Sequence, residues 1–206
     1  MSSFNPIRDP KQDALLTPQN AALIVIDYQP LQINSVTTMR RSEIIKNTSI
    51  LCQLAVDFKL PIVLSTVNVN TGVDKDTVAP IAEILKGIPS YDRTSINSWE
   101  DKEFYEAVLA TGRKKLLMAA LWTEACLAFP ALDALREGFE VYPVVDTVGG
   151  TSHIAHETAL RRLEQAGAQL TSVSQVACEL QRDWNRKETA SSMAKALYGN
   201  GSFVKM

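Results

Sequence analysis

Continuously apolar runs alternate with amphipathic segments along most of this 206-residue chain. The apolar runs are rich in branched residues, which is typical of strands buried on both faces of a sheet. Strands are predicted over residues 21–27, 61–66, 114–121, 139–146 and 168–173. Between them, apolar residues recur at helical spacing. Helices are predicted over residues 41–60, 76–87, 100–112, 123–138, 151–167, 174–184 and 188–199, with a short strand or loop from residue 90.

The alternation of strand and helix indicates the fold class. Apolar strands that do not alternate in polarity favour a parallel sheet with helices on both faces. Right-handed crossovers then give an α/β fold, a single-domain doubly wound parallel sheet in a Rossmann-like three-layer arrangement. Ligands bind such sheets at the carboxyl ends of the strands, near the point where the strand order reverses. We therefore expect the chemistry at that edge.

Three regions are predicted along the chain. Residues 1–20 are polar and contain prolines, so we expect an N-terminal arm that lies along the body or along a neighbouring subunit. Residues 21–184 form the α/β domain, and residues 185–206 form a C-terminal helix and tail. Apolar residues within 193–206 would otherwise be exposed, which together with the arm indicates a homo-oligomer.

The composition is that of an ordinary globular protein: 46% of the residues are hydrophobic, 21% are charged and the net charge is −2. No basic block is present, so neither nucleic acid nor an anionic membrane surface is expected as a partner. No apolar stretch approaches the roughly 18–20 residues of a membrane span. The three cysteines share no short spacing and the N-terminus has no signal-peptide core, which favours a cytoplasmic location.

An aspartate, Asp27, ends the first predicted strand. A carboxylate there must lie at the exposed tip or find a donor, because an unpaired buried charge is costly. Asp27 could cap local backbone amides, or it could serve chemistry. Asp146 ends the strand 139–146 in the same way, so a strand-end aspartate alone is a weak sign of a site.

A cysteine, Cys126, follows the strand 114–121 and falls in the predicted first turn of a helix. Free cysteine is often simply a small buried residue. The unpaired amides and the dipole at a helix start favour an anion, however, and would lower the pKa of this thiol. Cys52 and Cys178 lie inside apolar helical patterns and are expected to be structural.

An arginine, Arg93, stands at the end of the short strand segment that begins at residue 90. A lone arginine is most often solvated. Directed into the same crevice as Asp27 and Cys126, it would stabilise a thiolate and could bind a carboxylate. The two histidines, His153 and His156, lie on one predicted helix without an evident third metal ligand, so a capping or surface role is expected.

Together these segments resemble the isochorismatase-like cysteine hydrolase family over roughly residues 20–182. "AALIVIDYQ" is similar to the family's first strand with its catalytic aspartate, and "LLMAALWTEACLAFPALDALREG" is similar to its nucleophile turn. A lysine completes the family's triad, and Arg93 stands in its place here. "INSWED", "TEACLAFPAL" and "VACELQRDW" are similar to the YcaC-like subgroup, which implies an octamer or a similar closed homo-oligomer.

The resemblance implies a covalent mechanism in which Cys126 attacks a carbonyl carbon and Asp27 takes the thiol proton. Arg93 would act through its fixed charge, because arginine stays protonated. The resemblance also implies a cis peptide bond at Leu121–Trp122 and an oxyanion hole made by the backbone amides of Trp122 and Cys126. The residues expected to shape the substrate pocket are Gln29, Asn97, Trp99, Trp122 and Thr123.

The predicted function is a cysteine hydrolase of a small amide, ester or related carbon–heteroatom bond, with a thioester-type intermediate and without a cofactor. The family's nicotinamidases hold a metal with an aspartate and histidines, but no histidine lies between Asp27 and Arg93, so no metal is expected. The alternative is a non-catalytic small-ligand-binding or assembly protein that keeps the pocket, and the arginine motivates it. A redox sensor would need a resolving cysteine, and neither Cys52 nor Cys178 ends a strand.

Overall fold

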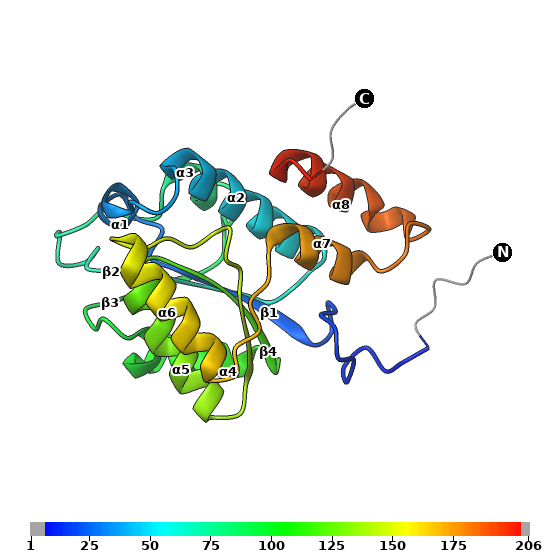
Figure 1. Cartoon of the computed structure of the whole chain (residues 1–206), viewed down its shortest axis with the longest axis horizontal. Helices are drawn as coiled ribbons and strands as arrows, with labels where there is room; N and C mark the ends of the chain where they lie inside the picture. The colour runs from blue at the N-terminus through cyan, green and yellow to red at the C-terminus, as the bar shows by residue number, and fades with distance from the viewer. Residues whose placement is uncertain (1–6, 203–206) are drawn as a thin grey trace.

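A parallel sheet with the strand order β3-β2-β1-β4-β5 lies at the centre of the protein, described here over residues 7–202 of a computed structural model (Figure 1). β1 pairs with both β2 and β4, so the strand order reverses at the carboxyl ends of β1 and β4. The predicted doubly wound α/β fold is confirmed. The strands are β1 (Ala21–Ile26), β2 (Ile62–Val67), β3 (Ser90–Arg93), β4 (Lys115–Ala120) and β5 (Glu140–Pro143).

Helices cover both faces of the sheet, with α2, α7 and α8 on one face and α4, α5 and α6 on the other (Figure 1). Within residues 7–202, no helix is both long and apolar enough to cross a membrane. The helices are α1 (Pro30–Ser35), α2 (Arg41–Asp57), α3 (Ala79–Ala82), α4 (Lys102–Ala110), α5 (Ala128–Arg136), α6 (His153–Gln165), α7 (Val173–Gln181) and α8 (Lys187–Asn200), with the 3₁₀ turn η1 (Ser98–Glu100) and the π-helical turn η2 (Thr123–Leu127).

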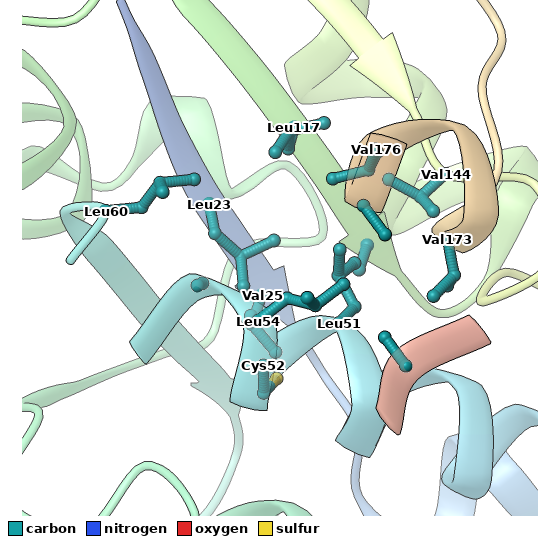
Figure 2. Close-up of a cluster of buried hydrophobic side chains, with 14 of the residues drawn as sticks. Leu23, Val25, Leu51, Cys52, Leu54, Leu60, Leu117, Val144, Val173 and Val176 are labelled. Atoms are coloured by element: carbon teal, nitrogen blue, oxygen red, sulfur yellow. The ribbon is translucent and has the colours of Figure 1, made fainter. Parts of the chain in front are cut away.

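The apolar run of β1 divides its side chains between two cores. Leu23 and Val25 face the cluster beneath α2 and α7 (Figure 2), whereas Ile24 and Ile26 face the cluster beneath α4, α5 and α6. All four side chains are fully buried, and each contributes about 1.5–3 kcal/mol to folding. Burial on both faces explains why β1 shows no polar alternation.

The segment 168–173, predicted as a strand, lies outside the sheet, and this prediction is wrong. The Thr171 amide donates to the Pro143 carbonyl at 3.0 Å, and Thr171 pairs with Val144 only as an isolated bridge. Pro143 has no amide hydrogen to donate in return, so the ladder is interrupted there, and beyond it the Val145 amide donates to the Thr171 carbonyl at 2.8 Å. The fifth strand is instead β3, in the segment expected to be a strand or a loop.

Two helix predictions also differ from the structure. The helix predicted over 76–87 is reduced to α3, four residues long, and turns follow it to Gly87, whose φ is 91°. Such a positive φ ends a helix and suits glycine. The short helix α1 was not predicted, although Pro30 stands at its first position, where proline is well tolerated.

Both chain ends pack on the body where they are described. In the arm, Leu16 is fully buried and its amide donates to Glu179 Oε2 at 2.7 Å. In α8, Met193, Ala196 and Leu197 are buried against α2 and α7, so the expectation of exposed apolar residues is wrong for these three, whereas Tyr198 is exposed. The part of that expectation that concerns residues 203–206 lies outside the described residues.

Candidate active site

The three residues singled out from strand ends meet at the carboxyl edge of the sheet. Asp27 directly follows β1, Arg93 is the last residue of β3, and Cys126 lies in η2, just beyond β4. Asp27 has a left-handed backbone conformation with φ 61°, which aspartate tolerates better than most residues. The topology therefore brings together residues separated by up to about a hundred positions along the chain.

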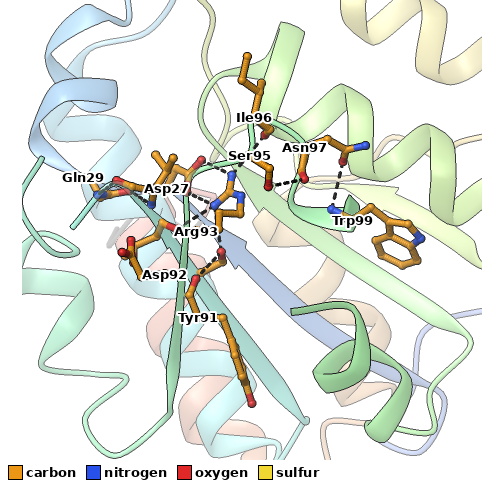
Figure 3. A network of polar contacts seen from close by, with 12 residues as sticks. Asp27, Gln29, Tyr91, Asp92, Arg93, Ser95, Ile96, Asn97 and Trp99 are labelled. Atoms are coloured by element: carbon orange, nitrogen blue, oxygen red, sulfur yellow. Dashed lines mark hydrogen bonds and ion pairs between the residues drawn. The ribbon is translucent and has the colours of Figure 1, made fainter. Parts of the chain in front are cut away.

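Asp27 and Arg93 form a two-pronged ion pair (Figure 3). Arg93 Nη1 donates to Asp27 Oδ1 at 2.8 Å, and Nη2 donates to Oδ2 at 2.7 Å. The two side chains are 0% and 1% exposed, respectively. Arg93 Nη1 also donates to Ser65 Oγ and to the Thr66 carbonyl, both at 3.0 Å. This geometry fixes the plane of the Asp27 carboxylate.

Burial shapes the electrostatics of Asp27. It raises the pKa of this carboxyl above the ordinary value, although the hydrogen bonds and charge of Arg93 and the hydrogen bond with Cys126 oppose that rise. A carboxylate with a raised pKa is a better proton acceptor near neutral pH than an exposed aspartate. The arrangement therefore suits a general base held in a fixed orientation.

Cys126 is buried beside this carboxylate, with a residue exposure of 7%. Burial and then the negative charge and hydrogen bond of Asp27 raise the pKa of the thiol, while Arg93 and the Trp122 backbone lower it only in part. The expectation of a lowered pKa is therefore wrong, because burial and Asp27 outweigh the effects of a helix start. The resting form is a neutral thiol in contact with a base.

The turn that carries Cys126 is π-helical rather than the start of a regular α-helix. The Leu127 amide donates to the Trp122 carbonyl, five residues earlier, at 3.1 Å. Pro130 has no amide hydrogen to bind the Cys126 carbonyl, as an α-helix would require. Such single wide turns often occur at functional sites. The preceding Leu121–Trp122 peptide bond is cis, as the resemblance implies.

Trp122 and Thr123, which open this turn, have partners on both sides of it. The Trp122 indole donates to Ser35 Oγ at 2.8 Å and to the Gln32 carbonyl at 3.2 Å, both on α1. Thr123 Oγ1 lies 2.8 Å from His156 Nδ1 on α6. This contact is not evident from the sequence, because His156 lies on a different crossover and a capping or surface role is expected for it there.

Gln29, expected in the pocket, is fully buried, and its side-chain amide is hydrogen-bonded to backbone groups. Its Nε2 donates to the carbonyls of Val67 and Lys75 at 2.9 and 2.8 Å, and its Oε1 accepts the Val67 amide at 2.8 Å. These bonds tie the end of β1 to the connection between β2 and β3. They account for a glutamine here without a substrate.

Asn97 and Trp99 lie to one side of the ion pair, and the Trp99 ring points away from Arg93 (Figure 3). Asn97 Nδ2 donates to Asp133 Oδ2 at 2.7 Å, and its Oδ1 caps η1. The Trp99 indole donates to Glu137 Oε1 at 3.0 Å. The aromatic rings that meet Trp99 edge to face are those of Phe104, Tyr105 and Phe139. These contacts fix the segment after Arg93 onto α5.

The family model described as "Isochorismatase domain" matches residues 21–175. This chain belongs to the isochorismatase family. The match contains all three strand-end residues of the site and stops within α7. The family assignment predicted from the motifs is confirmed.

Among isochorismatase-family proteins, this chain is 39% identical to "Probable hydrolase YcaC" of Escherichia coli over 170 residues, or 82% of this chain and 81% of that protein. It is 26% identical to "Secreted isochorismatase effector Isc1" of Phytophthora sojae, over 84% of this chain and 82% of that protein. The similarity to YcaC therefore extends over most of both chains.

Solved structures of the family agree with this similarity. YcaC from Pseudomonas aeruginosa, with hexane-2,5-diol and covalent acrylamide, superposes with a TM-score of 0.86 at 33% identity, covering 92% of this chain and 93% of that one. YcaC from Escherichia coli, an octameric hydrolase of unknown specificity, gives 0.86 at 35% identity, covering 93% of each chain. A nicotinamidase from Bacillus subtilis, at 18% identity and a TM-score of 0.63, shares the fold. The chain thus belongs to the isochorismatase-like hydrolase family and is similar to YcaC in sequence and structure.

Proposed function

We propose that this protein is a cysteine hydrolase that cleaves a small amide, ester or related carbon–heteroatom bond, with Cys126 as nucleophile and Asp27 as base. The observation that carries the proposal is the buried Asp27–Arg93 ion pair, whose carboxylate is near enough to the buried Cys126 thiol to raise its pKa. A nucleophile in contact with a base that a third group orients is the usual arrangement for covalent catalysis.

The reaction proceeds in two halves. Cys126 Sγ forms a bond to the carbonyl carbon while its proton passes to Asp27. That proton then moves from Asp27 to the leaving nitrogen or oxygen as the carbon–heteroatom bond breaks, which leaves a thioester. In the second half, Asp27 takes a proton from water, the hydroxide adds to the thioester, and the thiolate leaves and is reprotonated from Asp27. The products are an acid and an amine or alcohol.

The remaining groups stabilise charge and hold positions. The backbone amides of Trp122 and Cys126 are proposed to bind the developing oxyanion, as the family resemblance implies. Arg93 keeps the Asp27 carboxylate oriented and offsets its charge, but it does not transfer protons because its pKa stays far above neutral. Trp122 and Thr123, next to the nucleophile turn, are the pocket residues that we retain from the sequence prediction.

We also propose a homo-oligomer, because the similar YcaC of Escherichia coli is octameric. Sedimentation velocity at micromolar concentration tests this directly. A single large species with about eight times the monomer mass is expected, and a monomer would contradict the proposal.

The hydrolase proposal is tested with a panel of small amides and esters, followed by intact-mass spectrometry during turnover. We expect an acyl adduct on Cys126 in the wild type and neither adduct nor turnover in Cys126→Ala. Cys178→Ala is the control because Cys178 is exposed and outside the site, and it should retain full activity. Ligand binding across the panel without acylation or turnover would favour the non-catalytic alternative.

A further inference from the structure

A second carboxylate, Asp74, lies on the connection between β2 and β3 and has an unused oxygen. Its Oδ1 accepts the Lys75 amide at 2.7 Å. Its Oδ2 is buried and, among the residues that the structure describes, has no hydrogen-bond partner. Buried carboxylate oxygens are nearly always paired, and leaving one unpaired costs free energy. An oxygen of this kind next to a reactive site is a candidate for a ligand contact.

The segment that carries Asp74 is fixed against the site from two sides. The Asp74 amide donates to the Asn68 carbonyl at 3.2 Å, and Gln29, two positions after Asp27, binds the Lys75 carbonyl at 2.8 Å. Asp74 is close enough to Asp27 for its charge to contribute to the raised pKa of that carboxyl. The segment that carries Asp74 is therefore tied by Gln29 to the turn that carries the base.

A second segment of this connection is held by Asp92 on β3. Asp92 Oδ1 accepts the Val69 amide at 3.0 Å, and Oδ2 accepts the Asn70 amide at 2.8 Å. These contacts fix the connection at its start, just as Gln29 fixes it at Lys75. Asp74 lies between the two anchors, so its position does not depend on a bound ligand.

Among Asp27, Arg93, Cys126 and Asp74, the charges sum to a negative value. Asp27 and Arg93 neutralise each other, Cys126 is a neutral thiol at rest, and Asp74 adds one negative charge. Arg93 cannot bind a substrate carboxylate with its terminal nitrogens, because Nη1 and Nη2 already donate to Asp27 and Nη1 also donates to Ser65. The carboxylate that Arg93 binds is that of Asp27.

We propose that Asp74 determines substrate specificity: its free Oδ2 accepts a hydrogen bond from a substrate N–H, and its charge excludes substrates that carry a carboxylate. This inference rests on the proposed hydrolase function and narrows its substrate class. The class is small, uncharged or cationic molecules with an N–H donor next to the scissile carbonyl, of which primary carboxamides are the simplest. Asp74 acts on recognition and takes no part in proton transfer.

Two alkylating agents of nearly equal size test this proposal, because iodoacetamide carries an amide where iodoacetate carries a carboxylate. The second-order rate of modification of Cys126 is measured with each agent by peptide mass spectrometry, and exposed Cys178 in the same sample serves as reference. We expect the amide-to-carboxylate rate ratio at Cys126 to exceed that at Cys178 by about tenfold, as charge repulsion in a partly buried site predicts.

Asp74→Asn removes the charge with little change of shape and should bring that ratio down by about tenfold, mainly through faster reaction with iodoacetate. Asp76→Asn is the matched control, since Asp76 is an exposed carboxylate on the same segment, and it should leave the ratio unchanged. Asp74→Ser is a second variant in case the asparagine forms a new contact. Melting temperatures of all variants verify that they are folded.

An unchanged ratio in both Asp74 variants would overturn the proposal, and so would an equal change in Asp76→Asn. A Cys126 that neither agent reaches would also overturn it, since the proposal requires one ligand to contact Cys126 and Asp74 together. These readouts need no turnover. A ratio that responds to Asp74 in a protein without hydrolase activity would contradict the hydrolase proposal alone, whereas hydrolysis with an unresponsive ratio would contradict the Asp74 proposal alone.

Discussion

Asp27 and Asp146 both end an apolar stretch of the sequence, yet the fold uses them differently. Asp146 accepts the Val173 amide at 2.9 and 3.3 Å and the Asn200 side chain at 3.2 Å, so it holds the start of α7 and the end of α8. Asp27 pairs with a guanidinium and a thiol and is completely buried. One carboxylate has neutral structural partners, whereas the other has a charged partner and a nucleophile.

The difference shows that a strand-end position does not by itself separate a structural carboxylate from a reactive one. The Val173 amide and the Asn200 side chain satisfy the hydrogen-bonding needs of Asp146, as neutral donors usually do for a carboxylate. No nucleophile contacts Asp146 among the hydrogen bonds described, so it has no proton to accept. Burial removes the water that would solvate the Asp27 carboxylate, and the ion pair with Arg93 compensates for that loss. Such a buried ion pair seldom stabilises a protein more than apolar residues of similar size would. A residue kept at such a cost indicates chemistry, and the following predictions test that interpretation.

The largest effect is expected for hydrolysis in Asp27→Asn. Removal of the base should lower kcat by about a thousandfold on any substrate the panel identifies, since general base catalysis typically contributes about 10²–10⁴. Asp146→Asn is the matched variant and should stay within about twofold of wild type. Equal losses in the two variants, measured by steady-state kinetics, would remove the distinction between these carboxylates.

The second effect is a loss of stability in Arg93→Met. This variant leaves Asp27 buried without its partner, which typically costs about 3–5 kcal/mol in the free energy of unfolding. Lys102→Met breaks an exposed ion pair with Glu106, whose side chains are 84% and 62% exposed, and should cost less than about 0.5 kcal/mol. Urea unfolding curves measure both values, and a cost for Arg93→Met near that of the control would contradict the prediction.

The third effect concerns the pH dependence of Cys126 alkylation by iodoacetamide. Because burial and Asp27 raise the pKa of this thiol, its rate should keep rising with pH beyond about 10, where an unperturbed thiol with a pKa of about 8.5 has reached its plateau. Asp27→Asn removes a charge that opposes the thiolate and should speed alkylation at pH 8 by about tenfold. Cys52, whose pKa burial raises to about 12, should remain unmodified in the folded protein.

The third measurement is decisive because Asp27→Asn is expected to change the rates of alkylation and of hydrolysis in opposite directions. Asp27→Asn should accelerate alkylation while it abolishes hydrolysis, because the first reaction needs only a thiolate and the second also needs an activated water. Slower alkylation in the variant would contradict the prediction and mean that Asp27 withdraws the thiol proton even from an alkyl halide. Peptide mass spectrometry resolves the three cysteines in one experiment.

The smallest effect is expected for Asp146→Ala. The substitution leaves the Val173 amide and the Asn200 side chain without this acceptor, so about 1 kcal/mol of stability should be lost. Catalysis should be unchanged. A thermal shift assay beside the Asp27 variants measures the loss, and an activity defect without a loss of stability would give Asp146 a role that its contacts do not indicate.

The position of a residue in the fold could be predicted from the sequence where that position depends only on neighbouring residues along the chain. The β1 and β4 runs, and the residues just beyond them, could be placed at one edge because parallel strands share a direction. The strand prediction over 168–173 failed because this segment lies beside Pro143, which cannot donate a backbone hydrogen bond to it. The sequence does not reveal that these two segments are neighbours.

The parts of the site that escaped prediction depend on contacts between distant segments. His156 meets Thr123 from another crossover, and Gln29 is used by the backbone rather than left free. The raised pKa of Cys126 depends on how deeply Asp27 is buried, and a strand-end position does not give that depth. Asp74 gave no signal, because an aspartate in a polar connection is ordinary until its environment is known.

Gln29 has a consequence for how such a protein changes over evolution or in the laboratory. Its three hydrogen bonds join the turn after β1 to Val67 and to Lys75, so the base and the segment with Asp74 behave as one rigid module. A point substitution at Gln29 would disturb reactivity and selectivity together. New selectivity is therefore easier to obtain by exchanging residues 68–76 as a block. The replacement should keep a backbone carbonyl at the position of Lys75, so that Gln29 can still bind it.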